Sequence, residues 1–299
     1  MGWPRAGAVA IRPLAHQDPE GTVAPRMPTI VDRDRTVELL RGEFEAIAEF
    51  CRGLGAGEWA TPTCLPGWTV HDVLAHLVGT ESSLCGRPAP SADVSRFDHL
   101  RNPIAEANEV WVESMRSCSD EELLARFEEV TGERLASLEG MGQGEFDAPS
   151  WTPVGRDETY GRFMRIRHFD CYMHEQDMRM AVGATPRLAP ADVESCLDEV
   201  STGLGYVVGR RAALPDGSRV RFDLTGPGGR TILVAVDGRA AVTDALEGPP
   251  NVIVGMPAGR FLRMVGGRDD PDPDSLGPLE LGGDRALAEQ LVENLAYTI

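Results

Sequence analysis

The sequence predicts the fold class α + (α+β): a helical bundle at residues 31–188, then a smaller α+β domain at residues 189–299. In the first part, apolar residues recur at three- and four-residue spacing in long segments joined by loops, which is typical of a bundle. In the second part, short runs rich in Val and Ile alternate with Gly- and Pro-rich turns, which is typical of strands. The chain has 299 residues, enough for two cores, since single domains usually span roughly 100–200 residues.

Residues 1–30 are expected to form a disordered leader, because they lack periodicity and carry five prolines and three glycines. Arg12 and Pro13 interrupt the apolar stretch that a signal peptide would need, and no apolar run approaches the ~20 residues that span a bilayer. Six scattered cysteines without a CxxC motif indicate reduced thiols. We therefore expect a cytoplasmic protein.

The formal net charge of the chain is −18 at pH 7. A surface this acidic repels phosphate backbones and anionic lipid. Nucleic acid and membrane surfaces are therefore not expected as partners.

The first bundle helix is predicted from Asp34 to Leu54. Thr69, followed three residues later by Asp72, resembles a capping box and predicts a helix that runs to about Leu84. Ser119 heads a Ser-Asp-Glu-Glu stretch, a second N-cap signal. Further helices are expected at residues 103–116, 119–138 and 159–182, and the stretch DAPSWTPVGRDE before the last of them is expected to be a loop.

In the second domain, one helix is expected from Pro190 to Arg211. Strands are predicted at residues 220–224, 231–236, 240–243, 251–255 and 279–281, with helices at 257–265 and 284–296. Helices and strands of this kind make an α+β domain of about 110 residues.

Asp170 and His174 carry the strongest chemical signal, because they lie about 40° apart on one face of the helix predicted at 159–182. Phe163 and Ile166 share that face, which predicts that the pair points into the bundle. The opposite face is expected to be solvated and holds Arg165, His168, Glu175, Gln176 and Arg179. The alternative is an ordinary exposed Asp–His pair, but inward ionisable groups need a partner or a metal.

A metal would need a third ligand from another helix, and the helix that starts at Thr69 offers His71 and His76 on opposite edges of its apolar stripe. Periodicity does not choose between them, although His76 lies deeper along the helix. Two imidazoles and one carboxylate leave a fourth position open, as in catalytic zinc sites, and suit zinc or nickel. Asp177 is either an orienting partner of His174 or the acceptor of a helix-end hydrogen bond.

Two stretches resemble the signature segments of the mycothiol-dependent maleylpyruvate isomerase family: EWATPTCLPGWTVHDVLAHLVGTE and RIRHFDCYMHEQDMRMAVG. The resemblance covers residues 33–299 and implies a DinB-like metal-binding four-helix bundle followed by a sterol-carrier-like α+β domain, whose end the tail GGDRALAEQLVENL resembles. It implies that His76, the histidine of the AHL stretch, binds the divalent metal together with Asp170 and His174.

The resemblance also implies mycothiol, the low-molecular-weight thiol of actinobacteria, as cofactor or co-substrate. In an isomerase the thiolate adds to a conjugated double bond, rotation follows and the thiol leaves, whereas in an S-transferase it stays attached. A cation would hold a carboxylate substrate. Arg268 in MVGGRDD best matches the family arginine that faces the metal pocket, and Arg260 is the alternative.

One residue departs from the family pattern: members that perform the isomerisation typically carry Glu where this chain has Asp170. Metal binding is therefore expected, while the reaction stays open. We expect a small-molecule substrate and a low-molecular-weight thiol as partners of a monomer or homodimer.

Two other functions use the same scaffold: a metal-dependent hydrolase, and a non-catalytic metal- or lipid-binding protein. A binding protein has little reason to keep three converging ligands. The chain has no GxSxG motif, and its glycine clusters lack the lysine and spacing of phosphate loops.

Overall fold

The computed structural model describes residues 27–98, 100, 102–268, 270 and 272–298. Residues 1–26 of the expected leader lie outside this range. The chain divides into two compact units, one ending at Ala184 and the other beginning at Thr185. Each unit is described by itself.

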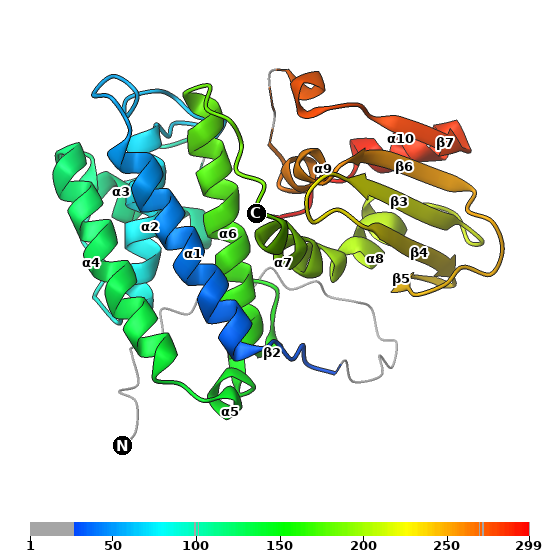
Figure 1. Ribbon diagram of the computed structural model, residues 1–299, viewed down its shortest axis with the longest axis horizontal. Helices are drawn as coiled ribbons and strands as arrows, with labels where there is room; N and C mark the ends of the chain where they lie inside the picture. The colour runs from blue at the N-terminus through cyan, green and yellow to red at the C-terminus, as the bar shows by residue number, and fades with distance from the viewer. Residues whose placement is uncertain (1–26, 99, 101, 269, 271, 299) are drawn as a thin grey trace. The chain divides into compact units, whose positions relative to one another are not determined.

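The first unit is a bundle of helices (Figure 1). Helices α1, α4, α2 and α6 form a closed ring in which each packs against the next, and α3 packs on α2. Their apolar faces meet in one core that includes Leu40, Leu74, Phe127 and Met164. The helices are α1 (Arg33–Arg52), α2 (Val70–Leu84), α3 (Pro103–Met115), α4 (Asp120–Glu139) and α6 (Tyr160–Ala181). All five match helices predicted from the sequence, and the helical fold of this part is confirmed.

The stretch expected to be a loop before α6 is partly ordered secondary structure, so that expectation was wrong. A short helix α5 (Gln143–Phe146) precedes a hairpin of β1 (Pro149–Thr152) and β2 (Gly155–Thr159). Both strands contact α6, and the Trp151 ring packs edge-on against Phe163, with centroids 6.0 Å apart. These packing contacts stabilise a hairpin too short to be recognised by its pattern.

The chain just before α1 also contacts this hairpin. The backbone N–H of Thr29 donates to Glu158 Oε2 at 3.0 Å, and the Thr159 hydroxyl donates to the Thr29 carbonyl at 2.6 Å. Thr29, which was expected to belong to the leader, is therefore tied to the bundle.

The second unit is a five-stranded sheet in the order β5-β4-β3-β6-β7 with helices against one face. Only β3 and β6 run parallel. On β3, Val220, Phe222 and Leu224 are buried, while the residues between them are partly exposed. The ring of Phe222 packs against that of Phe261 on α9, with ring centroids 5.4 Å apart. The strands are β3 (Arg219–Thr225), β4 (Thr231–Asp237), β5 (Arg239–Thr243), β6 (Val252–Pro257) and β7 (Glu280–Gly283), and the later helices are α9 (Ala258–Val265), η2 (Pro273–Leu276) and α10 (Arg285–Glu293). The α+β character of this part is confirmed.

The single helix predicted up to Arg211 is broken, and that prediction was wrong in detail. It consists of α7 (Pro190–Ser201), α8 (Leu204–Tyr206) and a π-helix η1 (Val207–Arg211). Tyr297 packs at the break: its hydroxyl donates to the Val200 carbonyl at 3.0 Å, and its ring fills the space where Gly203 would carry a Cβ. A partner 97 residues away cannot be read from local periodicity.

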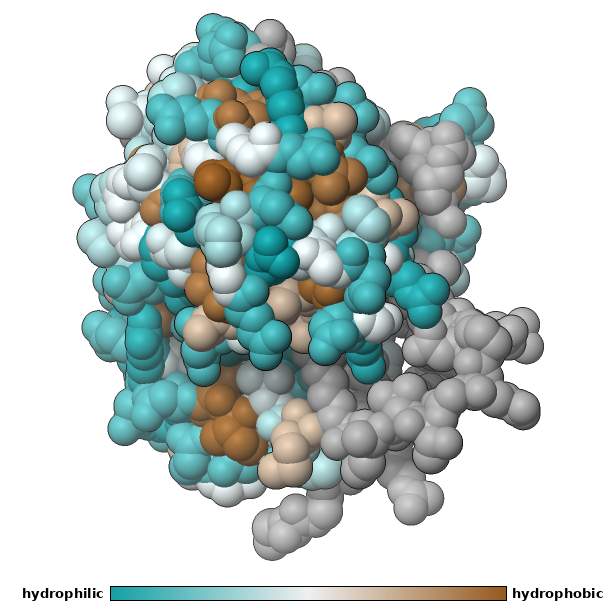
Figure 2. All heavy atoms as spheres, turned by 90° about the vertical axis from the view of Figure 1, so that its right-hand side faces the viewer, coloured by the Kyte–Doolittle hydropathy of each residue, from teal (hydrophilic) through white to brown (hydrophobic). Residues whose placement is uncertain are grey.

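Apolar side chains on the face shown in Figure 2 lie in small patches between polar ones. Among the described residues, no helix combines the length and apolar character that crossing a bilayer requires.

The contact between α2 and α3 generates a prediction about Gly79. Alanine normally favours a helix over glycine by about 1 kcal/mol, but a Cβ at this position would lie 2.4 Å from Trp111 Cβ. We predict that Gly79→Ala lowers the free energy of unfolding by about 1–3 kcal/mol, the usual range for overpacking. The matched control is Gly132→Ala on α4, where no atom lies within 4 Å, and it should stabilise by about 0.4–1 kcal/mol. Urea denaturation of both variants measures the difference, and a stabilising Gly79→Ala would contradict the packing described.

Candidate metal centre

The position of His76 follows from how α2 begins. Thr69 is the N-cap, and a capping box with Asp72 fixes the first turn, as the sequence predicted. His76 follows two turns later on the inner side of the helix, where it is 4% exposed. The capped start thus sets which residue of α2 faces α6.

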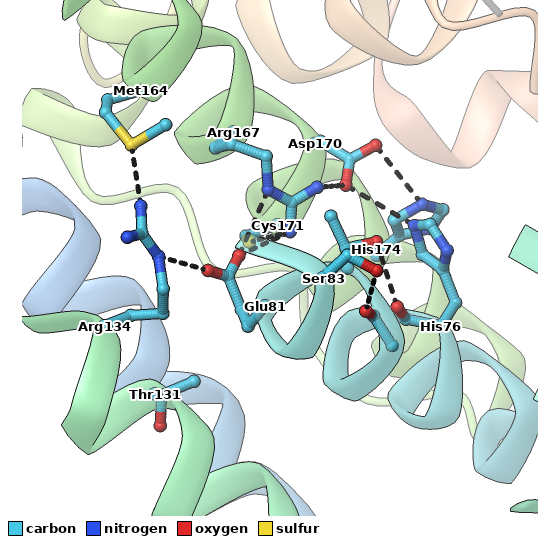
Figure 3. A network of polar contacts seen from close by, with 12 residues as sticks. His76, Glu81, Ser83, Thr131, Arg134, Met164, Arg167, Asp170, Cys171 and His174 are labelled. Atoms are coloured by element: carbon cyan, nitrogen blue, oxygen red, sulfur yellow. Dashed lines mark hydrogen bonds and ion pairs between the residues drawn. The ribbon is translucent and has the colours of Figure 1, made fainter. Parts of the chain in front are cut away.

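The structure brings His76 of α2 together with Asp170 and His174 of α6 (Figure 3). His76 Nε2 lies 3.5 Å from Asp170 Oδ2, and His174 Nε2 lies 3.6 Å from Asp170 Oδ1. All three ligand atoms fall within 4.8 Å of one another. The two imidazoles are buried, whereas the Asp170 side chain is 33% exposed, so the cluster opens to solvent on the carboxylate side.

The donor set fits a divalent metal. Neither ring nitrogen of His76 has a hydrogen-bond partner among the described residues, although both are buried. A buried nitrogen that faces a carboxylate at 3.5 Å, too far for a good hydrogen bond, leaves room for an ion between them. Two nitrogens and one oxygen suit zinc or nickel.

Charge prepares His76 and Asp170 for such an ion, whereas the raised pKa of His174 favours a protonated imidazole that must lose its proton before a metal binds. Burial lowers the pKa of His76, which keeps its imidazole neutral, the form that binds metals. Burial alone would also lower the pKa of His174, but Asp170 and Asp177 outweigh it and raise that pKa. Burial opposes ionisation of Asp170, yet the Arg167 guanidinium and His174 hold the pKa of this carboxyl well below its ordinary value. Asp170 is therefore an anionic ligand over the physiological range.

His71, the other candidate on α2, is engaged elsewhere. Its Nδ1 lies 3.0 Å from Asp120 Oδ1 and its Nε2 lies 3.2 Å from the Met115 carbonyl oxygen. Both ring nitrogens are thus occupied by protein partners. Of the two histidines that periodicity left open, the structure brings only His76 to the Asp170–His174 pair.

Asp177 lies behind His174. Its Oδ2 is 3.3 Å from His174 Nδ1, and its Oδ1 accepts from the Cys64 thiol at 3.4 Å. The carboxylate is fully enclosed. It is therefore placed to orient the imidazole, as one of the two sequence interpretations expected.

A buried chain of alternating charges holds Asp170 in place (Figure 3). Arg167 donates to Asp170 Oδ2 through Nη1 and to Glu81 Oε1 through Nη2 at 2.8 Å. Glu81 also accepts from Arg134 Nε at 3.2 Å, and Arg134 donates to the Tyr160 hydroxyl at 3.0 Å. The chain runs from α4 through α2 to α6. Sequence reasoning missed it, although Arg167 stands at the i,i+3 spacing from Asp170 that allows an ion pair.

The expectation that the opposite face of α6 is solvated was wrong. His168 and Glu175 are fully buried, and Gln176 is 3% exposed. Polar side chains tolerate burial when they are paired. Here Gln176 donates to Glu175 Oε2 at 3.0 Å and Arg179 donates to Glu175 Oε1 at 2.8 Å.

Arg268 and Arg260 both belong to the second unit. Arg260 is 6% exposed and donates to the Gly277 carbonyl from α9. Arg268 follows α9, is less buried, and donates to the Gly266 carbonyl at 2.7 Å. These contacts show Arg260 as part of the unit's own packing.

Two family models match the chain. The N-terminal domain of mycothiol maleylpyruvate isomerase matches residues 40–179, and the C-terminal domain of the same family matches residues 194–290. The chain belongs to the mycothiol maleylpyruvate isomerase family. The resemblance seen in the sequence is therefore confirmed, and the family is one of enzymes. No curated protein sequence matches the chain.

Solved structures show the same fold. A crystal structure of the mycothiol-dependent maleylpyruvate isomerase superimposes with a TM-score of 0.55 at 14% identity, covering 84% of this chain and 93% of that one. The structure of a histidine-to-alanine mutant of the mycothiol-dependent maleylpyruvate isomerase superimposes with a TM-score of 0.53 at 15% identity, covering 80% of this chain and 90% of that one. At identities this low, the superpositions show that the fold is shared and nothing more.

The buried charge chain generates a prediction about stability. Arg167→Met should lower the free energy of unfolding by about 3–5 kcal/mol, because it removes one of the two cations beside the buried Glu81 and the cation that pairs with Asp170. Arg87→Met is the matched control, since Arg87 is 35% exposed and pairs with two surface glutamates. It should cost less than about 1 kcal/mol. Equal losses in urea denaturation would show that the buried chain adds nothing to stability.

Proposed function

We propose that this family member is a metal-dependent enzyme that uses mycothiol as cofactor or co-substrate. It acts as an isomerase or S-transferase on a small electrophilic metabolite that is unsaturated or bears a carboxylate. The observation that supports this proposal most strongly is that His76, Asp170 and His174 come together in a cluster that opens to solvent on one side. A closed four-ligand cluster would instead suit a structural ion.

Each residue has a distinct part in the proposal. His76, Asp170 and His174 would hold zinc or nickel, and Asp177 would orient His174 through Nδ1. A bound divalent metal would lower the pKa of a thiol at its open position and so favour the thiolate. Arg167 keeps Asp170 ionised and fixes the direction of its carboxylate.

The free cysteines of the chain support a location in a reducing compartment. All six cysteines lie in the described part of the chain, and none forms a disulfide. Thiols persist in this form in the cytoplasm, where a low-molecular-weight thiol would also be reduced. The net charge of −18 disfavours nucleic acid as a partner.

The deciding experiment is a titration of the metal-loaded protein with mycothiol, followed by an assay with maleylpyruvate and with electrophiles that carry a leaving group. An isomerase returns the thiol unchanged, whereas an S-transferase consumes it as a thioether. Turnover that is independent of mycothiol would instead favour the hydrolase. Metal binding without thiol binding or turnover would favour a binding protein.

The metal site generates a prediction of its own. Wild-type protein purified without added metal should hold roughly one equivalent of zinc or nickel per chain by elemental analysis. His76→Ala and His174→Ala should lose it, and Asp170→Asn should bind it ~10–100-fold more weakly, a range borrowed from changes to the partners of metal ligands. His71→Ala is the matched control on the same helix and should keep the metal, because both nitrogens of His71 are bonded elsewhere. Retention of full metal by both His76→Ala and His174→Ala would exclude this site.

We also propose Arg268 as the cation that stabilises negative charge on the substrate. Arg268→Ala should lower turnover by about 100- to 1,000-fold, the range for losing a charge-stabilising donor, while the metal content and melting temperature stay the same. Arg239→Ala, at an exposed arginine of the same unit, is the control and should leave turnover unchanged. Arg260→Ala should instead lower the melting temperature, because Arg260 is buried and bonded to Gly277. Full turnover in Arg268→Ala would remove Arg268 from the proposed machinery.

A further inference from the structure

The two histidines of α2 are held in opposite ways. His71 has a protein oxygen within 3.2 Å of each ring nitrogen. His76 is more deeply buried, yet no described residue offers a hydrogen bond to its Nδ1, and its Nε2 faces Asp170 Oδ2 at 3.5 Å. An imidazole that ligates a metal through one nitrogen usually donates the other N–H to a partner that fixes the ring's orientation. His76 lacks that partner, so something else must set its ring plane.

Aromatic rings are what surround His76. The Trp68 indole lies over it with ring centroids 5.2 Å apart and planes tilted by 34°, close to an offset stack. The His174 ring meets it edge-on at 4.8 Å. Trp68 also comes within 6.4 Å of the His174 ring. One indole therefore packs on both histidines of the cluster.

Trp68 is itself fixed from the far side. Its Nε1–H donates to Glu109 Oε2 of α3 at 2.8 Å, and Glu109 is fully buried. Arg116 donates to the other oxygen of that carboxylate at 2.7 Å and also contacts Asp72 at 3.0 Å. Asp72 is the capping-box residue of α2, so this set of bonds ties the indole to the helix that carries His76.

We propose that Trp68 is the positioning residue of His76: its indole, anchored by Glu109, fixes the imidazole plane in place of the missing hydrogen bond. The inference rests on the proposed metal site and deepens it. The stack acts on the face of the ring and leaves both nitrogens free of contact with Trp68, so Nε2 can face Asp170 while the ring plane is held.

The test compares variants of the full chain after its metal has been removed with a chelator. Trp68→Phe keeps an aromatic ring but loses the bond to Glu109, and Trp68→Leu loses the stack as well. Trp59→Phe is the matched control, because Trp59 belongs to the same loop and packs edge-on against His71 at 6.3 Å. The measurements are the Kd for Zn²⁺, by competition with a chromophoric chelator, and the melting temperature of each metal-free variant.

Trp68→Leu should weaken Zn²⁺ binding by about 10- to 100-fold and Trp68→Phe by about 3- to 10-fold, the graded response expected when an orienting contact is removed in steps. Trp59→Phe should bind Zn²⁺ within about twofold of wild type, whatever it does to the melting temperature. A purely structural tryptophan would lower the melting temperature without this gradation in affinity. If Trp68→Leu does not fold, comparing the Kd for Zn²⁺ of Trp68→Phe with that of Trp59→Phe still tests the inference.

The possible failures are distinguishable. Wild-type affinity for Zn²⁺ in the Trp68 variants that fold would overturn this inference and leave the proposed function standing. A Trp59→Phe variant as impaired as Trp68→Phe would also overturn it, since any change in the loop would then suffice. A wild-type chain that binds no Zn²⁺ would overturn the proposed function and this inference together.

Discussion

The ion chain Arg134–Glu81–Arg167–Asp170, whose first three members are buried, is the interaction on which the arrangement of the bundle depends. Each member would be costly alone in this setting, and each is neutralised by its neighbours. Because the partners come from α4, α2 and α6, a slide of one helix along another would separate a pair. Asp170 is thus linked through Arg167 and Glu81 to helix α4, which contributes none of the three clustered residues.

The same chain sets the charge of the cluster. Its two guanidiniums and two carboxylates balance, and Asp177 adds a further carboxylate beside His174. Burial keeps His76 neutral, since it lowers the pKa of this imidazole. The carboxylates of Asp170 and Asp177, one on each side of the His174 ring, favour a cation over an anion at the point where Asp170 meets the imidazoles.

The features that could be predicted from the sequence are those set by residues close together in the chain. The capping box at Thr69 and the apolar spacing of the helices predicted the bundle, and the i,i+4 pair Asp170–His174 predicted the cluster. Contacts between distant residues could not be predicted. The bond from Trp68 to Glu109 spans 41 positions and that from Arg167 to Glu81 spans 86. The same limit explains the error over α6, since its polar face is buried through side-chain pairing that periodicity does not encode.

Family membership constrains the fold of this chain more tightly than its reaction, because chemistry is set by the groups at a site. By the resemblance seen in the sequence, the imidazoles of His76 and His174 follow the family pattern, whereas Asp170 is shorter than the Glu expected at this position. Arg167 bonds Oδ2 of that carboxylate, while Oδ1 lies on the side of His174. The same Oδ2 lies 3.5 Å from His76 Nε2, so Arg167 and His76 face one oxygen of the carboxylate. A difference in reaction between this chain and other family members is therefore expected to originate at the carboxylate, whose reach from α6 depends on the length of its side chain, rather than at the histidines.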